Sequence, residues 1–154
     1  QNAMKGLGHA IYTGKTLVRD EAFGVILADD LCINENGEGV LSQMVKIYEK
    51  YRCSVVAVME VPKEQTKSYG VVSGRFIEDD LIMVDDMVEK PDPAEAPTNL
   101  AIIGRYILTP DIFNILERTK DGMVLAYKFK GKRFDCGSID GFVEATNFFY
   151  ERSK

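Results

Sequence analysis

The sequence predicts a mixed α/β domain of the Rossmann-like class, with three layers and a central sheet that is parallel at its core and has antiparallel additions. Three observations predict this class. Two apolar runs flank an amphipathic helical pattern near the N-terminus, shorter strand-like runs follow, and a helical pattern closes the chain. The 154 residues are 45% hydrophobic and 28% charged, which suits one compact domain over residues 1–154.

The first elements are two strands with a helix between them. Residues 23–28 form an unbroken apolar run, which predicts a strand covered on both faces. Apolar residues at helical spacing predict a helix that starts at Val40 and includes Met44 and Tyr51. Residues 53–61 are rich in valine and end at Pro62, which predicts a second buried strand. The order strand, helix, strand predicts a right-handed crossover and a parallel pair.

The remaining elements are predicted from shorter patterns. Apolar runs predict strands at 69–72, 81–84, 86–89, 99–108, 124–129 and 133–134. Thr109 followed by Pro110 predicts the start of a short helix over 111–118. A last helix is predicted with Phe142, Ala145, Phe148 and Phe149 on its buried face.

Charge and cysteine content exclude several classes of protein. Nineteen basic and twenty-four acidic residues give a net charge of −5, which argues against a nucleic-acid-binding surface. No apolar stretch approaches the roughly 18 residues that cross a bilayer, so no membrane association is expected. Cys32, Cys53 and Cys136 are odd in number and widely spaced, which argues against disulfides and a structural zinc site. We therefore expect a soluble protein of the reducing cytoplasm.

Aspartates at the ends of predicted strands are candidate ligands for Mg²⁺. Asp29 and Asp30 follow the first strand, and Asp135 follows the strand at 133–134. Ligands of open α/β sheets bind at the carboxyl ends of strands, and Mg²⁺ takes carboxylate oxygens together with substrate phosphates. The alternative for each aspartate is a solvated loop or a helix cap.

Two further clusters could bind parts of a phosphorylated sugar or a nucleotide. Lys90 would suit a monophosphate and Glu89 would suit sugar hydroxyls, while Gly70 would let a sugar ring approach bare backbone. Gly6, beside His9, would let backbone N–H groups approach a base or a phosphate. The alternatives are an exposed charged turn, a strand entry and a glycine-rich turn before a helix.

Six blocks in order resemble the bacterial UTP-glucose-1-phosphate uridylyltransferases, a family of sugar nucleotidyltransferases. They are Lys-Gly-Leu-Gly-His-Ala at 5–10, Val-Ile-Leu-Ala-Asp-Asp at 25–30, Ser-Tyr-Gly-Val-Val at 68–72, Met-Val-Glu-Lys-Pro at 87–91, Asn-Leu-Ala-Ile-Ile-Gly-Arg-Tyr at 99–106 and Phe-Asp-Cys-Gly at 134–137. The first and fifth blocks separate this family from its thymidylyltransferase relatives. The resemblance covers essentially the whole chain.

The resemblance implies a glycosyltransferase-A-like fold and the Mg²⁺-dependent reaction of UTP with glucose 1-phosphate to UDP-glucose and pyrophosphate. A homodimer or homotetramer is implied as well. The implied site residues are Gln1 and Gly6 for uracil, Asp29 and Asp135 for Mg²⁺, Asp30 for substrate, Gly70 and Glu89 for glucose, and Lys90 for its phosphate. Lys90 and Asp29 would be the catalytic residues.

The sequence departs from the family pattern in two places. The family's glycine-rich loop, Gly-x-Gly-x-x-Arg, is not found, and a segment of the family is missing between Gly122 and Met123. We expect these residues to be part of a longer protein; a molecule of 154 residues alone would have half a nucleotide site and no turnover. The alternatives are a glucose-1-phosphate thymidylyltransferase and a truncated, non-catalytic sugar-phosphate-binding or oligomerisation module.

Overall fold

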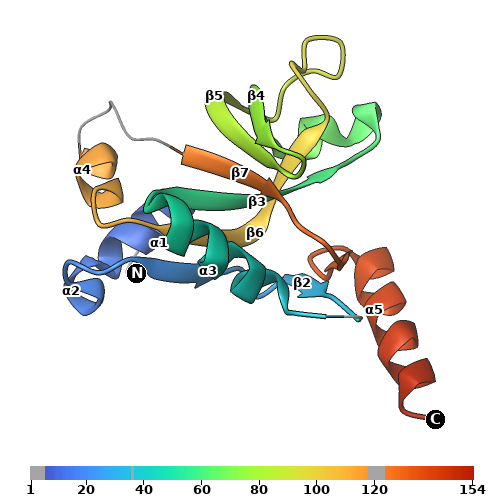
Figure 1. The fold of residues 1–154 in the computed structure, drawn as a ribbon. Coiled ribbons are helices and arrows are strands. Elements are labelled where there is room, and N and C mark those ends of the chain that lie inside the picture. Colours follow the sequence, from blue (N-terminus) through green and yellow to red (C-terminus); the bar gives the residue numbers. More distant parts are fainter. Residues whose placement is uncertain (1–5, 36, 118–123) are drawn as a thin grey trace.

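The computed structural model describes residues 6–35, 37–117 and 124–154 and confirms a mixed α/β fold with a mixed central sheet (Figure 1). The helices are α1 (Leu7–Thr13), α2 (Lys15–Val18), α3 (Val40–Tyr51), the 3-10 helix η1 (Lys63–Ser68), α4 (Ile112–Glu117) and α5 (Ile139–Arg152). The strands are β1 (Phe23–Ile26), β2 (Asp30–Ile33), β3 (Ser54–Glu60), β4 (Gly70–Glu78), β5 (Leu81–Glu89), β6 (Leu100–Leu108), β7 (Val124–Lys128) and β8 (Lys132–Asp135).

The main sheet has the strand order β1-β6-β3-β7-β5-β4. β3 and β7 are parallel, and the other neighbouring pairs that the structure describes are antiparallel. The predicted adjacent parallel pair of β1 and β3 is therefore wrong, because β6 lies between them and is antiparallel to both. The prediction that β1 is covered on both faces is wrong as well, since its residues alternate in exposure and Ile26 is 57% exposed.

The core lies on both faces of β3 and β6. On one face, Val55 and Ile103 pack with Met44 of α3, which crosses the sheet in Figure 1. On the other face, Val56 packs with Val72 of β4 and with residues of β5 and β7. β4 also pairs with β6, so the end of the sheet formed by β4 and β5 curls back over the second face.

β4 and β5 form one long hairpin in place of several short strands. The predicted break between 81–84 and 86–89 corresponds to a shift in the pairing of the two strands. Ser73 lies opposite Asp86, but the next residue, Gly74, lies opposite Val84. A Cβ on Gly74 would lie 2.0 Å from the carbonyl oxygen of Met83, so only glycine fits at this shift. Beyond this shift the two strands stay paired, and β4 begins at Gly70 where β5 ends at Glu89.

The small sheet of β2 and β8 and the helix α5 lie to one side of the main sheet (Figure 1). The side chain of Ser138 caps α5 by accepting a hydrogen bond from the Gly141 N–H at 3.1 Å. Ala145 is buried as predicted, but Phe142 is 60% exposed, so its assignment to the buried face is wrong. The predicted face holds α5 to β8, because the rings of Phe148 and Phe149 lie 5.1 and 6.4 Å from the ring of Phe134 between centroids, although Phe149 is 43% exposed. No helix among the described residues is long and apolar enough to span a membrane.

Candidate functional site

The pairing of β2 with β8 brings together two acidic segments that are distant in the sequence. Asp30 lies opposite Asp135 in this antiparallel pair. Asp29 directly precedes β2, and its carbonyl oxygen accepts a hydrogen bond from the Cys136 N–H at 2.7 Å. The two-stranded sheet thus brings Asp29 and Asp135, the two predicted Mg²⁺ ligands, together from distant segments.

The carboxylates of Asp29 and Asp135 converge beside Gly137. A Cβ on Gly137 would lie 3.2 Å from Asp135 Oδ1 and 3.3 Å from Asp29 Oδ2, so both oxygens border the space that this glycine leaves. Asp29 is exposed, and the Asp135 side chain is 39% exposed. Two carboxylates with room for water and phosphate oxygens fit Mg²⁺, which is rarely enclosed by protein ligands alone. Within the described residues, no third acidic, histidine or cysteine side chain completes a metal-binding group.

Asp30 occupies a different environment from Asp29. It is 7% exposed, its Oδ2 accepts a hydrogen bond from the Gly104 N–H at 2.7 Å, and its Oδ1 pairs with Arg133. A Cβ on Gly104 would lie 2.6 Å from Asp30 Oδ2, so glycine is needed for this close approach. Both carboxylate oxygens therefore face protein groups, and the structure does not direct Asp30 to the space beside Asp29.

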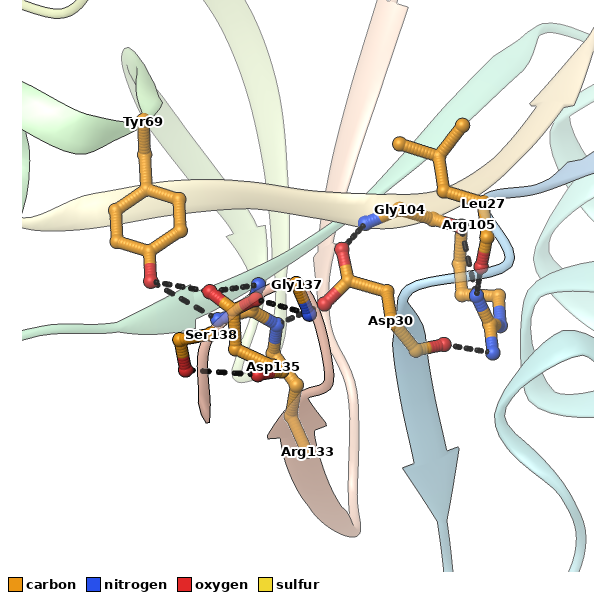
Figure 2. A network of polar contacts seen from close by, with 9 residues as sticks. All are labelled: Leu27, Asp30, Tyr69, Gly104, Arg105, Arg133, Asp135, Gly137 and Ser138. Atoms are coloured by element: carbon orange, nitrogen blue, oxygen red, sulfur yellow. Dashed lines mark hydrogen bonds and ion pairs between the residues drawn. The ribbon is translucent and has the colours of Figure 1, made fainter. Parts of the chain in front are cut away.

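Two buried arginines surround Asp30, and the sequence did not identify either as part of the site (Figure 2). Arg105 donates to the carbonyl oxygens of Leu27 at 3.2 Å, Gly104 at 2.8 Å and Asp30. An arginine within the otherwise apolar run at 99–108 was the available signal for it.

Arg133 connects three side chains of the network in Figure 2. It pairs with Asp30, reaches Asp135 Oδ2 at 3.1 Å and donates to the Tyr69 hydroxyl at 3.1 Å. Burial by itself would lower the pKa of Arg133, but the hydrogen bonds to Asp30 and Tyr69 outweigh burial and raise it. The guanidinium therefore keeps its charge beside the acidic pair. The signal for it was its position two residues before Asp135 on one strand face.

Tyr69 links this network to the second group of predicted residues. Its hydroxyl donates to Asp135 Oδ2 at 3.3 Å, and its carbonyl oxygen accepts from the Lys90 N–H at 2.9 Å. Gly70 lies opposite Glu89 in the β4–β5 pair, and a Cβ on Gly70 would lie 3.2 Å from Glu89 Oε2. The structure thus brings Gly70, Glu89 and Lys90 together at the open end of the hairpin.

Lys90 and Glu89 are placed to meet a ligand from solvent. Lys90 Nζ lies 3.7 Å from Glu89 Oε1, and the two side chains are 61% and 75% exposed. Lys90 has a φ of 49°, which turns the chain sharply after β5. An ammonium and a carboxylate are therefore presented together at the surface, beside a backbone position without a side chain.

Two residues, Gln1 and Gly6, are assigned to uracil by the sequence analysis. Gln1 lies outside the described residues. Gly6 begins α1 with a φ of 86°, and a Cβ there would have no neighbour within 4 Å, but the network in Figure 2 does not include it. Two cavities of about 560 and 280 Å³ lie against α3, and none of the predicted site residues lines either one.

Comparisons with known proteins show which proteins the chain is similar to. The family described as Nucleotidyl transferase matches residues 1–129. A UTP–glucose-1-phosphate uridylyltransferase of Pseudomonas aeruginosa is 59% identical over 169 residues, which cover 98% of this chain and 61% of that protein. One from Staphylococcus epidermidis is 40% identical over 164 residues, covering 95% of this chain and 56% of that protein.

Solved structures of similar proteins share the fold. A UDP-glucose pyrophosphorylase complexed with UDP-glucose superimposes with a TM-score of 0.93 at 50% identity, covering 97% of this chain and 64% of the other. A UTP-bound UGPase from Acinetobacter baumannii gives a TM-score of 0.85 at 32% identity, covering 94% of this chain and 56% of the other. The chain thus spans about three fifths of the length of its relatives. On these matches, the chain belongs to the nucleotidyl transferase family.

Proposed function

We propose that the chain is the part of a uridylyltransferase that holds Mg²⁺ and glucose 1-phosphate, in an enzyme that makes UDP-glucose and pyrophosphate from UTP and glucose 1-phosphate. The observation that carries this proposal is the convergence of Asp29 and Asp135 beside Gly137, with Tyr69 connecting them to Gly70, Glu89 and Lys90. The names of the relatives at 59% and 40% identity support it.

The proposed reaction is an in-line displacement. A phosphate oxygen of glucose 1-phosphate attacks the α-phosphorus of UTP, the bond from that phosphorus to the oxygen bridging to the β-phosphorus breaks, and pyrophosphate leaves. Lys90 would bind the phosphate of glucose 1-phosphate and reduce the repulsion between the two anions. Mg²⁺, held by Asp29 and Asp135, would supply further charge neutralisation.

The remaining residues would place the sugar and support the aspartates. Glu89 would accept hydrogen bonds from glucose hydroxyls, and the missing side chain at Gly70 would leave room for the ring. We propose that Asp30 supports the site from inside, because Gly104 and Arg133 occupy both of its carboxylate oxygens. Gln1 and Gly6 are proposed to contact uracil.

Several properties of the whole protein belong to the same proposal. We propose a cytoplasmic homodimer or homotetramer. The alignment with the P. aeruginosa relative runs over 169 residues, more than the 154 of this chain, which supports the proposal that a segment of the family is missing. We propose that this segment lies between Gly122 and Met123. A thymidylyltransferase remains the alternative nucleotide preference, and a non-catalytic sugar-phosphate-binding or oligomerisation module remains the alternative class.

The intact mass of the natural protein and an activity assay test the proposal together. We would measure the mass first and then assay Mg²⁺-dependent pyrophosphate release from UTP or dTTP with glucose 1-phosphate. A mass well above 17.2 kDa, with release from UTP exceeding release from dTTP, is the expected result. Preference for dTTP would assign the thymidylyltransferase. Binding of glucose 1-phosphate without pyrophosphate release would assign the binding module, and absence of both would overturn the proposal.

A further inference from the structure

Tyr69 occupies the position where the two halves of the proposed site meet. Its side chain extends to the acidic network in Figure 2, while its backbone belongs to the start of the β4–β5 hairpin. The guanidinium carbon of Arg133 lies 5.1 Å from the centre of the Tyr69 ring, so the ring is also held by a cation–π contact. One residue therefore contacts Asp135 with its side chain and Lys90 with its main chain.

The hydrogen bonds of Tyr69 limit how the Asp135 carboxylate can rotate. The Tyr69 hydroxyl accepts from Arg133 Nη1 and uses its single proton for Asp135 Oδ2. The other oxygen, Oδ1, accepts from the Gly137 N–H at 3.2 Å and is the oxygen beside the space shared with Asp29. With Oδ2 held by Tyr69 and Arg133, Oδ1 stays directed toward that space.

The main chain of Tyr69 fixes the turn that carries Lys90. The Tyr69 carbonyl oxygen accepts the Lys90 N–H at 2.9 Å, directly after the pair of Gly70 with Glu89. Lys90 has positive φ, a conformation that a lysine keeps only where its surroundings hold it. A shift of Tyr69 would therefore change the position of the Lys90 ammonium as well as the orientation of Asp135.

We propose that Tyr69 is a positioning residue that couples the metal-binding carboxylates to the sugar-phosphate end of the site. The proposal rests on the proposed function, and it adds a prediction that the function alone does not make. Binding of a divalent cation beside Asp135 and binding of glucose 1-phosphate at Lys90 strengthen one another through Tyr69, because each ligand favours the same placement of its side chain and main chain.

The test measures two binding equilibria and their coupling in the 154-residue chain. Mn²⁺, used as a spectroscopic substitute for Mg²⁺, is titrated by electron paramagnetic resonance with and without glucose 1-phosphate. Glucose 1-phosphate is titrated by calorimetry with and without Mg²⁺. Tyr69→Phe removes the hydroxyl and keeps the ring; Tyr127→Phe is the matched control, since its hydroxyl donates to Gln43 at 2.9 Å in another part of the fold.

In the wild-type chain, each ligand is expected to lower the Kd of the other. In Tyr69→Phe, the Kd for Mn²⁺ is expected to rise about threefold to tenfold, the change that loss of one ordinary hydrogen bond corresponds to, and the coupling is expected to disappear. Tyr127→Phe is expected to keep both the Kd for Mn²⁺ and the coupling.

Circular dichroism melting curves compare the folding of the variants. If Tyr69→Phe is unfolded, Arg133→Lys replaces it, because lysine cannot reach Asp30, Asp135 and Tyr69 together and the same loss of coupling is expected.

The outcomes separate this inference from the proposed function. A wild-type chain that binds neither Mn²⁺ nor glucose 1-phosphate overturns the proposed function, and the role of Tyr69 with it. A wild-type chain that binds both, with the same Kd values and coupling in Tyr69→Phe, overturns the role of Tyr69 alone. Loss of coupling in Tyr127→Phe as well would show a general effect on the fold and would also overturn it.

Discussion

The carboxylate of Asp30 and the guanidinium of Arg133 form an ion pair whose side chains are only 9% and 8% exposed. The pair joins β2 to β8 at the base of the site, since Asp30 also accepts from Gly104 of β6 and Arg133 also contacts Asp135. Removing Arg133 leaves the buried Asp30 carboxylate without its cation, and removing Asp30 leaves the buried Arg133 with Asp135 as its acidic partner; either change is more costly than losing an exposed pair.

The first prediction follows from this pair. Asp30→Asn and Arg133→Met are each expected to lower the free energy of unfolding by about 3–5 kcal/mol, because each leaves a buried charge. The double variant is expected to lose less than the two single variants together. Urea unfolding at pH 7 measures all three. The control is Glu38→Gln, whose partner Lys46 is 69% exposed, and its expected cost is under about 1 kcal/mol. Additive effects of Asp30→Asn and Arg133→Met would contradict the pairing.

The second prediction concerns Lys90 and the sugar phosphate. In the protein that shows turnover, Lys90→Ala is expected to raise KM for glucose 1-phosphate and to lower kcat, since a cation on the attacking phosphate is lost. A decrease of about tenfold to a hundredfold in kcat/KM is expected, as for loss of a hydrogen bond between charged groups. Lys130→Ala is the control, because this exposed lysine pairs with Asp80 away from the site. Unchanged kinetics in Lys90→Ala would remove Lys90 from the site.

The third prediction concerns the two converging aspartates. Asp29→Asn and Asp135→Asn each replace a charged ligand oxygen by an amide, so the Mg²⁺ concentration for half-maximal activity is expected to rise at least about tenfold. A titration of activity against Mg²⁺ measures it, with Asp20→Asn in the exposed turn before β1 as the control. A titration curve that does not move in either variant would show that these carboxylates do not hold the metal.

The sequence predicted the elements better than their arrangement. Apolar periodicity located α3 at Val40–Tyr51 because its spacing depends on the helix alone. The insertion of β6 between β1 and β3 depends on pairing across about 80 residues, and no local pattern records it. The same holds for α5, where the helix was predicted but Phe142 lies on its exposed side.

The candidate site shows the same division between residue type and spatial arrangement. Asp29, Glu89 and Lys90 could be proposed from the sequence, because charged residues at strand ends next to turns point to ligands. Arg133 and Tyr69 were not proposed, since an arginine two residues before Asp135 and a tyrosine before a glycine are weak signals in isolation. Their role depends on the β2–β8 pair, which places residues from three segments in one network.

The fourth prediction uses a pair of glycines. A Cβ on Gly70 would lie 3.2 Å from Glu89 Oε2 and 3.3 Å from Ile102 Cδ1, which are ends of side chains that can move. Gly70→Ala is therefore expected to fold, with a stability change under about 1 kcal/mol, but to displace Glu89 and raise KM for glucose 1-phosphate several-fold. Gly39→Ala is the control, because a Cβ there meets nothing within 4 Å. An unchanged KM in Gly70→Ala would show that the sugar does not approach this backbone.

The fifth prediction concerns the thiol of Cys32 on β2. Burial raises the pKa of Cys32 from 9.0 to about 11, with the charge of Asp30 adding to the rise and those of Arg105 and Arg133 opposing it. The folded protein thus holds the thiol proton more tightly than the unfolded chain. This contribution to stability is complete below about pH 9 and is lost as the pH rises toward about 11.

Two measurements check this thiol. Alkylation of Cys32 at pH 8, followed by mass spectrometry, is expected to be about a hundredfold slower in the folded protein than in urea, as a pKa difference of two units requires. Urea unfolding between pH 8 and pH 11 is expected to show a smaller alkaline loss of stability in Cys32→Ala than in the wild type. Lysines and tyrosines titrate in the same range in both proteins, so the difference between the two curves isolates Cys32. Equal alkylation rates in folded and unfolded protein would mean that the thiol is not protected by burial on β2.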